Sequence, residues 1–236
     1  MNVTLYPAET RGHSRLAWLD SHFCFSFADW FNRDRLHYGA LRVLNDDWIS
    51  ANSGFGTHPH DNMEIVSIGL SGELEHKDSM GHAQRITGED VQAMSAGTGI
   101  THSEINPSPD QPCHLLQIWI IPDRKGHTPR YDQVHFPAEG RKNRLQALVS
   151  PDGTNGTLPM HQRAWVDRAD LEAGLKLELP SVDEGSGLYL YLPSGELLCE
   201  GHQMRAGDAL TIDGPGTSHV EALQDSQLVV IRVPLR

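Results

Sequence analysis

The sequence predicts an all-β protein made of two consecutive barrel domains with few short helices. Its apolar segments are short and end at turn residues. The 22 Gly and 14 Pro are spread along the chain, which favours many turns over long helices. A GxGxxHxE pattern occurs twice, at residues 97–104 and 214–221. Each copy follows a turn with Gly and an acidic residue and then a short apolar strand, so we interpret the two halves as a duplicated β-domain.

The first half of the chain contains a series of apolar runs that are bounded by turns. Strands are predicted at residues 40–44, 65–70, 73–76, 91–94 and 115–121. Short strands at such spacing are typical of a sandwich or barrel. We assign this N-terminal domain to residues 1–122.

A polar segment follows, and residues 123–144 are predicted to be a linker because they carry prolines and several charges. Short strands then resume in a C-terminal domain at residues 145–236. They are predicted at residues 145–149, 175–179, 188–192, 209–212 and 228–233.

Composition limits the classes of partner. A formal net charge of −12 disfavours direct nucleic-acid binding and binding to an anionic membrane surface, which both need clustered Lys and Arg. The first residues show no signal-peptide pattern, and the apolar runs are too short to span a bilayer. Three widely spaced cysteines without a CxxC motif predict buried, reduced thiols in a cytoplasmic protein. We expect a monomer.

Two short motifs place metal-binding side chains on strands. His58 and His60 are two positions apart, as are His102 and Glu104. Residues i and i+2 of a strand point to the same face. If the two strands face each other across a barrel, three imidazoles and one carboxylate converge. Such a set suits one first-row divalent metal with open positions for water or substrate.

Neither motif is specific alone, since a chain with 14 His in 236 residues contains about 0.8 HxH patterns by chance. Three histidines and one glutamate can also form a hydrogen-bonded cluster without a metal. The context strengthens the metal interpretation. HxHxxxE at residues 58–64, followed by GxxHxxxN at residues 99–106, is the two-part signature of cupin barrels.

Five segments of the first half closely resemble the pirin family of bicupins: RGHSRLAWLDSHFCFSFADWF, LNDDW, GFGTHPHDNMEIVSIGLSGELEHKDSMG, VQAMSAGTGITHSEINPS and LLQIWIIP. The resemblance covers most of residues 11–123 and is much weaker beyond the linker. It implies a bicupin fold in which the N-terminal barrel holds one metal ion, usually iron.

By this resemblance the metal ligands are His58, His60, His102 and Glu104. Glu64 lies where many other cupins place their carboxylate ligand, and similarity to pirins implies that it lies behind the ligands instead. Fe²⁺ is the metal that the family implies, although the donor set also suits Mn²⁺, Co²⁺, Ni²⁺, Cu²⁺ or Zn²⁺.

The second barrel is predicted to hold no metal. It keeps His219 and Glu221, but no histidine occurs near Leu175 and Leu177, where counterparts of His58 and His60 are expected. His219 is therefore expected to be structural. The spacing of His161 and His202 fits no motif. Trp119 and Met94 are expected to be core residues. Five further histidines are expected to be surface or packing residues: His76, His82, His114, His127 and His135.

Bacterial proteins similar to pirins are associated with quercetin 2,3-dioxygenase activity. The resemblance therefore implies a small aromatic enol substrate and dioxygen. The metal would lower the pKa of the enolic hydroxyl and orient it, and Glu104 would act as catalytic base. Opening of the heterocycle would release carbon monoxide. The flat substrate is expected to contact apolar residues of the barrel wall, with these candidates: Ile65, Ile68, Met94 and Ile118.

Two other functions fit the same residues. Eukaryotic pirins act as iron-dependent transcriptional cofactors that bind protein partners, so the chain is alternatively a metal-dependent regulatory protein without turnover. The third hypothesis is an enzyme that acts on a different enol or catechol-like substrate, because the fold and the metal ligands do not determine the substrate.

Overall fold

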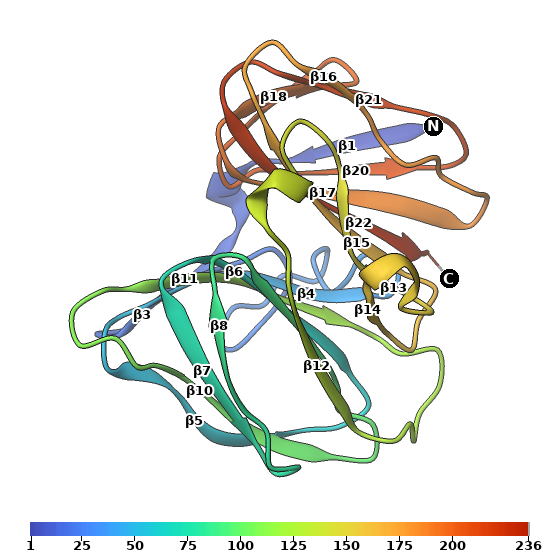
Figure 1. The fold of residues 1–236 in the computed structure, drawn as a ribbon. Coiled ribbons are helices and arrows are strands. Elements are labelled where there is room, and N and C mark those ends of the chain that lie inside the picture. Colours follow the sequence, from blue (N-terminus) through green and yellow to red (C-terminus); the bar gives the residue numbers. More distant parts are fainter. Residues whose placement is uncertain (236) are drawn as a thin grey trace.

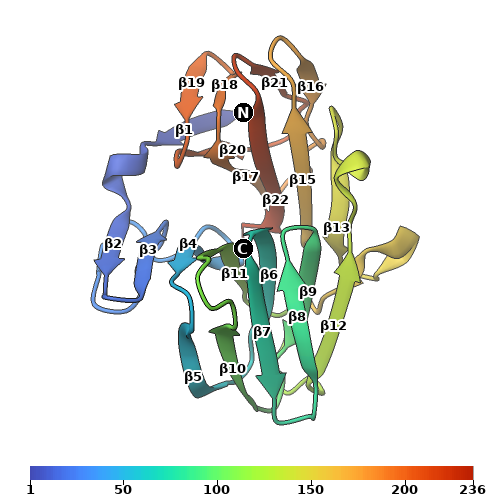
Figure 2. The same ribbon diagram turned by 60° about the vertical axis from the view of Figure 1, so that its left-hand side comes forward.

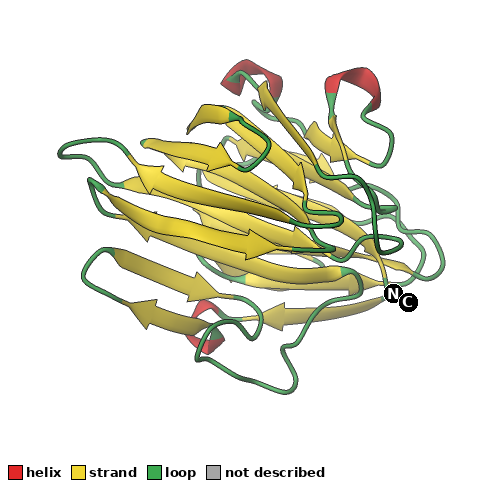
Figure 3. Cartoon of the chain, turned by 90° about the horizontal axis from the view of Figure 1, so that it is seen from below, coloured by secondary structure: helices red, strands yellow, loops and turns green. Residues whose placement is uncertain are grey.

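The computed structural model describes residues 1–235 and is built almost entirely of β-strands (Figure 3). Two domains are stacked one above the other (Figure 1), and each combines a seven-stranded sheet with a four-stranded sheet. The only helical elements in this range are three single 3₁₀ turns: η1 (Ala8–Thr10), η2 (Ala138–Gly140) and η3 (Thr154–Gly156). The prediction of an all-β chain with few short helices is confirmed. No helix among residues 1–235 is long and apolar enough to cross a membrane.

The N-terminal domain contains the first pair of sheets. The larger sheet has the order β12 (Arg130–His135), β9 (Asp90–Ser95), β6 (Glu64–Ser71), β11 (Cys113–Ile120), β4 (Leu41–Ile49), β3 (Leu19–Phe23) and β2 (Gly12–Arg15). The smaller sheet has the order β5 (Ser53–His60), β10 (Ile100–Asn106), β7 (Glu73–Asp78) and β8 (Ala83–Thr87).

The C-terminal domain repeats this plan. Its larger sheet has the order β1 (Asn2–Tyr6), β20 (Ala209–Asp213), β17 (Ser186–Ser194), β22 (Ser226–Pro234), β15 (Trp165–Leu171), β13 (Gln146–Ser150) and β14 (Leu158–Pro159). Its smaller sheet has the order β16 (Lys176–Glu178), β21 (His219–Ala222), β18 (Glu196–Cys199) and β19 (His202–Arg205). Every predicted strand coincides with or overlaps one of these elements.

Two edge strands cross the domain boundaries expected from the sequence. Strand β1 pairs with β20, so residues 2–6 lie in the C-terminal domain (Figure 2). Strand β12 lies within the segment expected to be a linker, yet it pairs with β9 along its whole length. Only Tyr131 of β12 is buried. A strand with such a polar, half-exposed pattern resembles a loop in sequence, which explains why the pattern predicted a linker.

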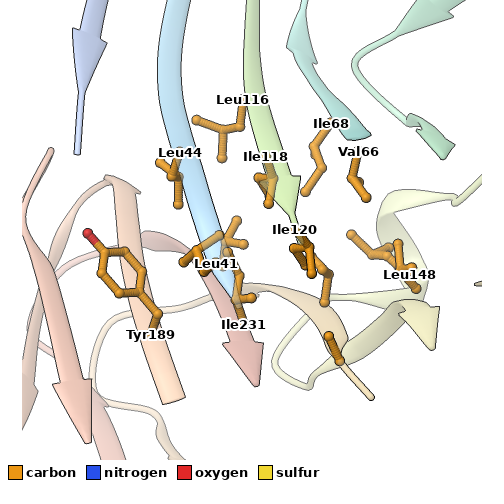
Figure 4. Close-up of a cluster of buried hydrophobic side chains, with 14 of the residues drawn as sticks. Leu41, Leu44, Val66, Ile68, Leu116, Ile118, Ile120, Leu148, Tyr189 and Ile231 are labelled. Carbon is orange, nitrogen blue, oxygen red and sulfur yellow. The ribbon is translucent and has the colours of Figure 1, made fainter. Parts of the chain in front are cut away.

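The main hydrophobic core lies between the two domains. The large sheets pack against each other, and alternate residues of each strand point into this interface. Figure 4 shows the contact, where Ile118, Ile120 and Ile68 of the first domain meet Tyr189 and Ile231 of the second. Burial of this apolar surface joins the domains into one body.

The interiors of the two barrels differ in polarity. The second is filled with aliphatic side chains, including Leu190, Leu210 and Val230. The other face of the large N-terminal sheet carries buried polar residues instead: Asn45, Asp47, Ser67, Gln92 and Gln117. The first barrel therefore has a polar interior that can bind a ligand or metal, whereas the described residues of the second fill its interior with aliphatic side chains. The predicted buried thiols are confirmed, since Cys24, Cys113 and Cys199 are all buried and free.

Candidate metal centre

Strands β5 and β10 bring the three predicted histidines together. The two strands are hydrogen-bonded neighbours in one sheet, and His58 lies directly opposite His102. The ring centroids are 4.5 Å apart for His58 and His102, 4.8 Å for His58 and His60, and 4.9 Å for His60 and His102. One nitrogen from each ring lies within 4.8 Å of the others. The sequence motifs predict strands that face each other across the barrel, but in the structure two adjacent strands bring the three imidazoles together.

A close backbone approach shapes this strand pair. The register between β5 and β10 shifts between His102 and Glu104, which marks a bulge-like irregularity. Gly54 lies opposite this region, and a Cβ atom there would come within 2.1 Å of the Glu104 carbonyl oxygen. Only glycine permits this approach, so Gly54 helps to set the position of Glu104.

The carboxylate of Glu104 lies beside the histidines but outside their group of three. It joins His102 and His76 in a second set of donors within 4.8 Å of one another. The Gln117 amide donates to both carboxylate oxygens, at 3.0 and 3.2 Å, and the Ser67 hydroxyl donates to Gln117 at 2.9 Å. Burial raises the pKa of Glu104, whereas the hydrogen bond from Gln117 opposes that shift. Gln117 is thus a positioning residue that the sequence argument missed.

A relay of side chains orients His102 from behind. Asp78 lies 3.2 Å from His76 Nε2, and His76 Nδ1 lies 3.3 Å from His102 Nδ1. Burial opposes ionisation of Asp78, but hydrogen bonds from His82 and His76 lower its pKa. The ionised carboxylate accepts from His76 Nε2, so His76 Nδ1 is an acceptor and His102 Nδ1 must donate. The lone pair of His102 then lies on Nε2, the nitrogen left free for a metal.

The donor atoms fit a divalent metal. His102 Nε2 is buried and has no hydrogen-bond partner among residues 1–235, and such orphaned atoms are rare in folded proteins. The ring of His58 is held through Nδ1 by the Gly56 carbonyl at 2.8 Å, which leaves Nε2 for coordination. Burial lowers the pKa of His60 to about 4 and that of His102 to about 2. Both rings are therefore neutral at pH 7, as metal ligands must be.

The relay leads to a test at His76. We expect His76→Phe to weaken metal affinity about 10- to 100-fold, because outer-shell partners of ligating histidines have effects of this size. His76→Asn should restore part of the loss, since its side-chain oxygen can accept from His102 Nδ1. Competition titration with a chelator measures the affinity, and nitrogen NMR of the metal-free protein reports the His102 tautomer. The matched control is His135→Phe, at an exposed histidine. Equal affinities for parent and His76→Phe would contradict the role of the relay.

Glu64 does not belong to the donor group. It is buried, and its carboxylate accepts from the Ser95 hydroxyl at 2.7 Å and from the His161 backbone amide at 3.1 Å. Along β6 it shares a face with Val66 and Ile68, which point into the interdomain core. These contacts argue against a ligand role and tie Glu64 to the second domain instead.

Several residues expected to be surface or packing residues have other environments. His76 is completely buried in the relay, and His127 stacks on His161 with centroids 3.8 Å apart. Trp119 is only partly buried, and its indole lies edge-to-face with His60 at 4.9 Å. The contacts with His102, His161 and His60 join segments that are far apart in the sequence and leave no spacing signal, whereas His76 and its partner Asp78 lie two positions apart on β7.

A cavity of about 410 Å³ opens beside the histidines. His58, His60 and Glu104 form part of its lining, and Asn45 and Asp47 form another part. Five aromatic residues also line the cavity, together with small, aliphatic and polar residues: Trp18, Phe23, Phe27, Phe55 and Trp119. This volume and apolar lining are typical of small-molecule sites.

The expected substrate-contacting residues are not part of this lining. Ile68 and Ile118 point into the interdomain core, so their assignment to the substrate wall was wrong. Ile65 and Met94 lie on the barrel side but pack with Tyr131 behind Trp119. Aromatic residues from the N-terminal segment replace them. The apolar pattern identified buried strand positions but not which face each one occupies.

Asp47 gives a pH-dependent test of the cavity. Burial raises its pKa to about 7, well above its value of about 3.9 in an unfolded chain. Between pH 4 and 7 the folded state therefore holds a proton that the unfolded state has lost, so stability falls as pH rises. We expect the stability of Asp47→Asn relative to the parent to rise by about 3 kcal/mol from pH 4 to pH 8. Urea unfolding at several pH values measures this, and parallel pH profiles would contradict it.

The second copy of the motif faces the opposite way. His219 and Glu221 point outward, while Val220 and Ala222 fill the aliphatic interior. The residue opposite His219 is Glu178, in the place that His58 occupies opposite His102. His219 is therefore an exposed residue and not the structural one expected. A one-residue shift in which strand positions point inward is sufficient to turn the histidine and glutamate of the motif away from the barrel interior.

Taken together, the four sheets, the duplicated plan and the donor residues of β5 and β10 define a bicupin with a candidate metal centre in its first barrel. The chain belongs to the pirin family. The Pirin family model matches residues 6–120, and the model for the quercetinase C-terminal cupin domain matches residues 147–233.

Relatives match over the full length. Quercetin 2,3-dioxygenase of Escherichia coli K12 is 39% identical over 234 residues, which cover 98% of this chain and 99% of that protein. The crystal structure of the bacterial pirin YhhW of E. coli in complex with nickel(II) superposes with a TM-score of 0.94 at 36% identity, covering all of both chains. GK1651 of Geobacillus kaustophilus shares the fold at 21% identity, with a TM-score of 0.80 over 100% of this chain and 96% of that one.

Proposed function

We propose that the chain is a metal-dependent dioxygenase that cleaves flavonols such as quercetin. One observation carries this proposal: a single cavity is lined both by metal-binding side chains and by a set of aromatic walls. A flat aromatic enol fits such walls, and its enolic oxygen would reach the donor group. The 39% identity to quercetin 2,3-dioxygenase of E. coli supports the same reaction.

The metal centre is part of the proposal. His58, His60, His102 and Glu104 would hold one divalent ion, and Fe²⁺ is our choice within a set that includes Mn²⁺, Co²⁺, Ni²⁺, Cu²⁺ and Zn²⁺. The nickel(II) complex of the E. coli pirin supports a divalent ion. When bound, the ion supplies Lewis acidity that lowers the pKa of the enolic hydroxyl.

The chain's own residues would perform the remaining steps. Glu104 lies buried in the cavity wall, where its carboxylate would accept the enolic proton as general base. Gln117 holds the carboxylate on the cavity side through its two hydrogen bonds. The aromatic walls orient the substrate ring and exclude water from it. Three buried thiols fit a reducing compartment, so we place the reaction in the cytoplasm.

Oxygen uptake tests the proposal. Protein reconstituted anaerobically with Fe²⁺ should consume dioxygen when quercetin is added, and carbon monoxide should appear as the heterocycle opens. Glu104→Gln is expected to lower the rate at least 100-fold while keeping the three histidines, a size typical of losing a general base. His58→Ala should abolish uptake together with metal binding. If the parent binds metal stoichiometrically yet consumes no oxygen with any flavonol, the regulatory alternative replaces the enzyme.

A further inference from the structure

The cavity has a polar wall opposite its metal-binding wall. The histidines and Glu104 come from β5 and β10 of the small sheet, whereas Asn45 and Asp47 come from β4 of the large sheet. Asn45 and Asp47 are two positions apart, so both side chains point to the same face. That face is the barrel interior, and both residues belong to the cavity lining.

Asn45 offers a hydrogen-bond acceptor that the protein leaves unused, and Asp47 keeps a second carboxylate oxygen besides the one bonded to Ser21. Asn45 Oδ1 is buried and has no partner among residues 1–235. The carboxylate of Asp47 is buried and receives a hydrogen bond from the Ser21 hydroxyl. No Lys, Arg or His of the described chain forms an ion pair with it. Unpartnered buried acceptors cost free energy, so a polar donor from outside the protein is expected to satisfy them.

The rest of the cavity determines what kind of molecule can bring such a donor. Trp18 and Phe55 form an edge-to-face pair with centroids 5.1 Å apart, and Phe27 and Trp119 form another at 5.4 Å. All four line the cavity together with the two acceptors. An aromatic ring bearing hydroxyl groups satisfies both surfaces, since its faces contact the walls while its hydroxyls donate.

We propose that Asn45 and Asp47 form a hydroxyl-recognition subsite, which selects aromatic enols carrying further ring hydroxyls over enols without them. The subsite rests on the proposed function, because it deepens the substrate class of the same cavity. Asn45 and Asp47 are specificity-determining residues in this scheme and take no part in the chemistry. A site built to hydrogen-bond hydroxyls discriminates strongly against analogues that lack them, since its buried acceptors would stay unpaired.

Comparing two flavonols distinguishes binding at this subsite from binding at the proposed metal ligands. Quercetin carries additional ring hydroxyls, whereas 3-hydroxyflavone keeps the enol beside the carbonyl and has no other hydroxyl group. Dissociation constants under argon, measured by quenching of tryptophan fluorescence, involve no turnover. The parent is expected to bind quercetin at least ~10-fold more tightly than 3-hydroxyflavone. Asn45→Leu and Asp47→Leu remove the acceptors, so each should weaken quercetin binding about 10-fold and leave 3-hydroxyflavone within about twofold.

The matched control is Asp20→Leu, the same substitution on the outer face of β3 and outside the cavity lining, which should change neither constant. Circular dichroism checks that each variant is folded, and the ratio of the two constants in the parent needs no variant. Equal binding of both flavonols by the parent would overturn the subsite and leave the proposed function standing. Unchanged quercetin binding in both folded variants would also overturn it. If the parent binds neither flavonol, the subsite and the proposed function both fail.

Discussion

Replacing His102 by alanine is expected to abolish metal binding while the protein stays folded. His102 Nε2 is buried and has no hydrogen-bond partner among residues 1–235, and the contacts with His76 and Asp78 orient it toward His58 and His60. Its loss would remove one of the proposed ligands, the one that His76 and Asp78 orient. We expect metal content to fall from about one ion per chain to below ~0.1, because structural and catalytic sites rarely survive loss of a central ligand. Elemental analysis after dialysis against the metal measures this.

The second barrel supplies the matched control for this prediction. His219 occurs in the same GxGxxHxE pattern as His102, yet it is exposed and lies opposite Glu178. His219→Ala should retain full metal content. A thermal shift on adding metal should be present in the parent and in His219→Ala and absent in His102→Ala, since a ligand stabilises only a protein that binds it. Retained metal in His102→Ala would contradict the assignment.

Replacing Ile118 by alanine is expected to destabilise the whole chain by about 3 kcal/mol, the usual cost of such a truncation in a packed core. Ile118 is fully buried between the two domains, as Figure 4 shows. Surrounding side chains from both large sheets cannot collapse into the space without losing contacts of their own. Urea unfolding followed by circular dichroism and by tryptophan fluorescence should give coincident transitions at a lower midpoint.

Ile121 is the control for Ile118 because it is of the same type, only three residues further along, and exposed. Ile121→Ala should change stability by less than about 0.5 kcal/mol. Ile118→Ala should also leave flavonol affinity unchanged, since the side chain points away from the cavity. A lower flavonol affinity with unchanged stability would indicate that Ile118 contacts the substrate after all. Two separate unfolding transitions in the parent would contradict a core shared by both domains.

Sequence patterns were sufficient for the fold class and for the group of histidines. His58, His60 and His102 are recognisable because the two-residue period of a strand places i and i+2 on one face, and the structure brings these rings together. The same local rule identified apolar strands but could not assign their faces. Ile118 and Ile68 show the consequence, because strands between two packed layers are apolar whichever side faces the site.

The supporting residues were not visible in the sequence. Asp78 and His76 lie two positions apart on β7. The contact of His76 with His102, the hydrogen bonds from Gln117 to Glu104 and the stacking of His127 on His161 instead join residues on different strands or segments. No local spacing encodes such pairs, because strand order and register determine which side chains meet. The same holds for the polar strand β12, whose place in the first sheet depends on pairing with β9.

The amino-acid sequence by itself thus specifies two β-domains, their turns and the donor side chains that lie on one face of a single strand. These features depend on contacts between residues that are close in sequence. The direction in which the side chains of the second motif point depends instead on the tertiary structure. Both copies read GxGxxHxE, yet His102 is buried and His219 is exposed. An aliphatic interior favours Val220 and Ala222 on the inner face of the second barrel, whereas the first barrel keeps its inner face polar. Burial of apolar area across distant strands selects between these two arrangements of one motif.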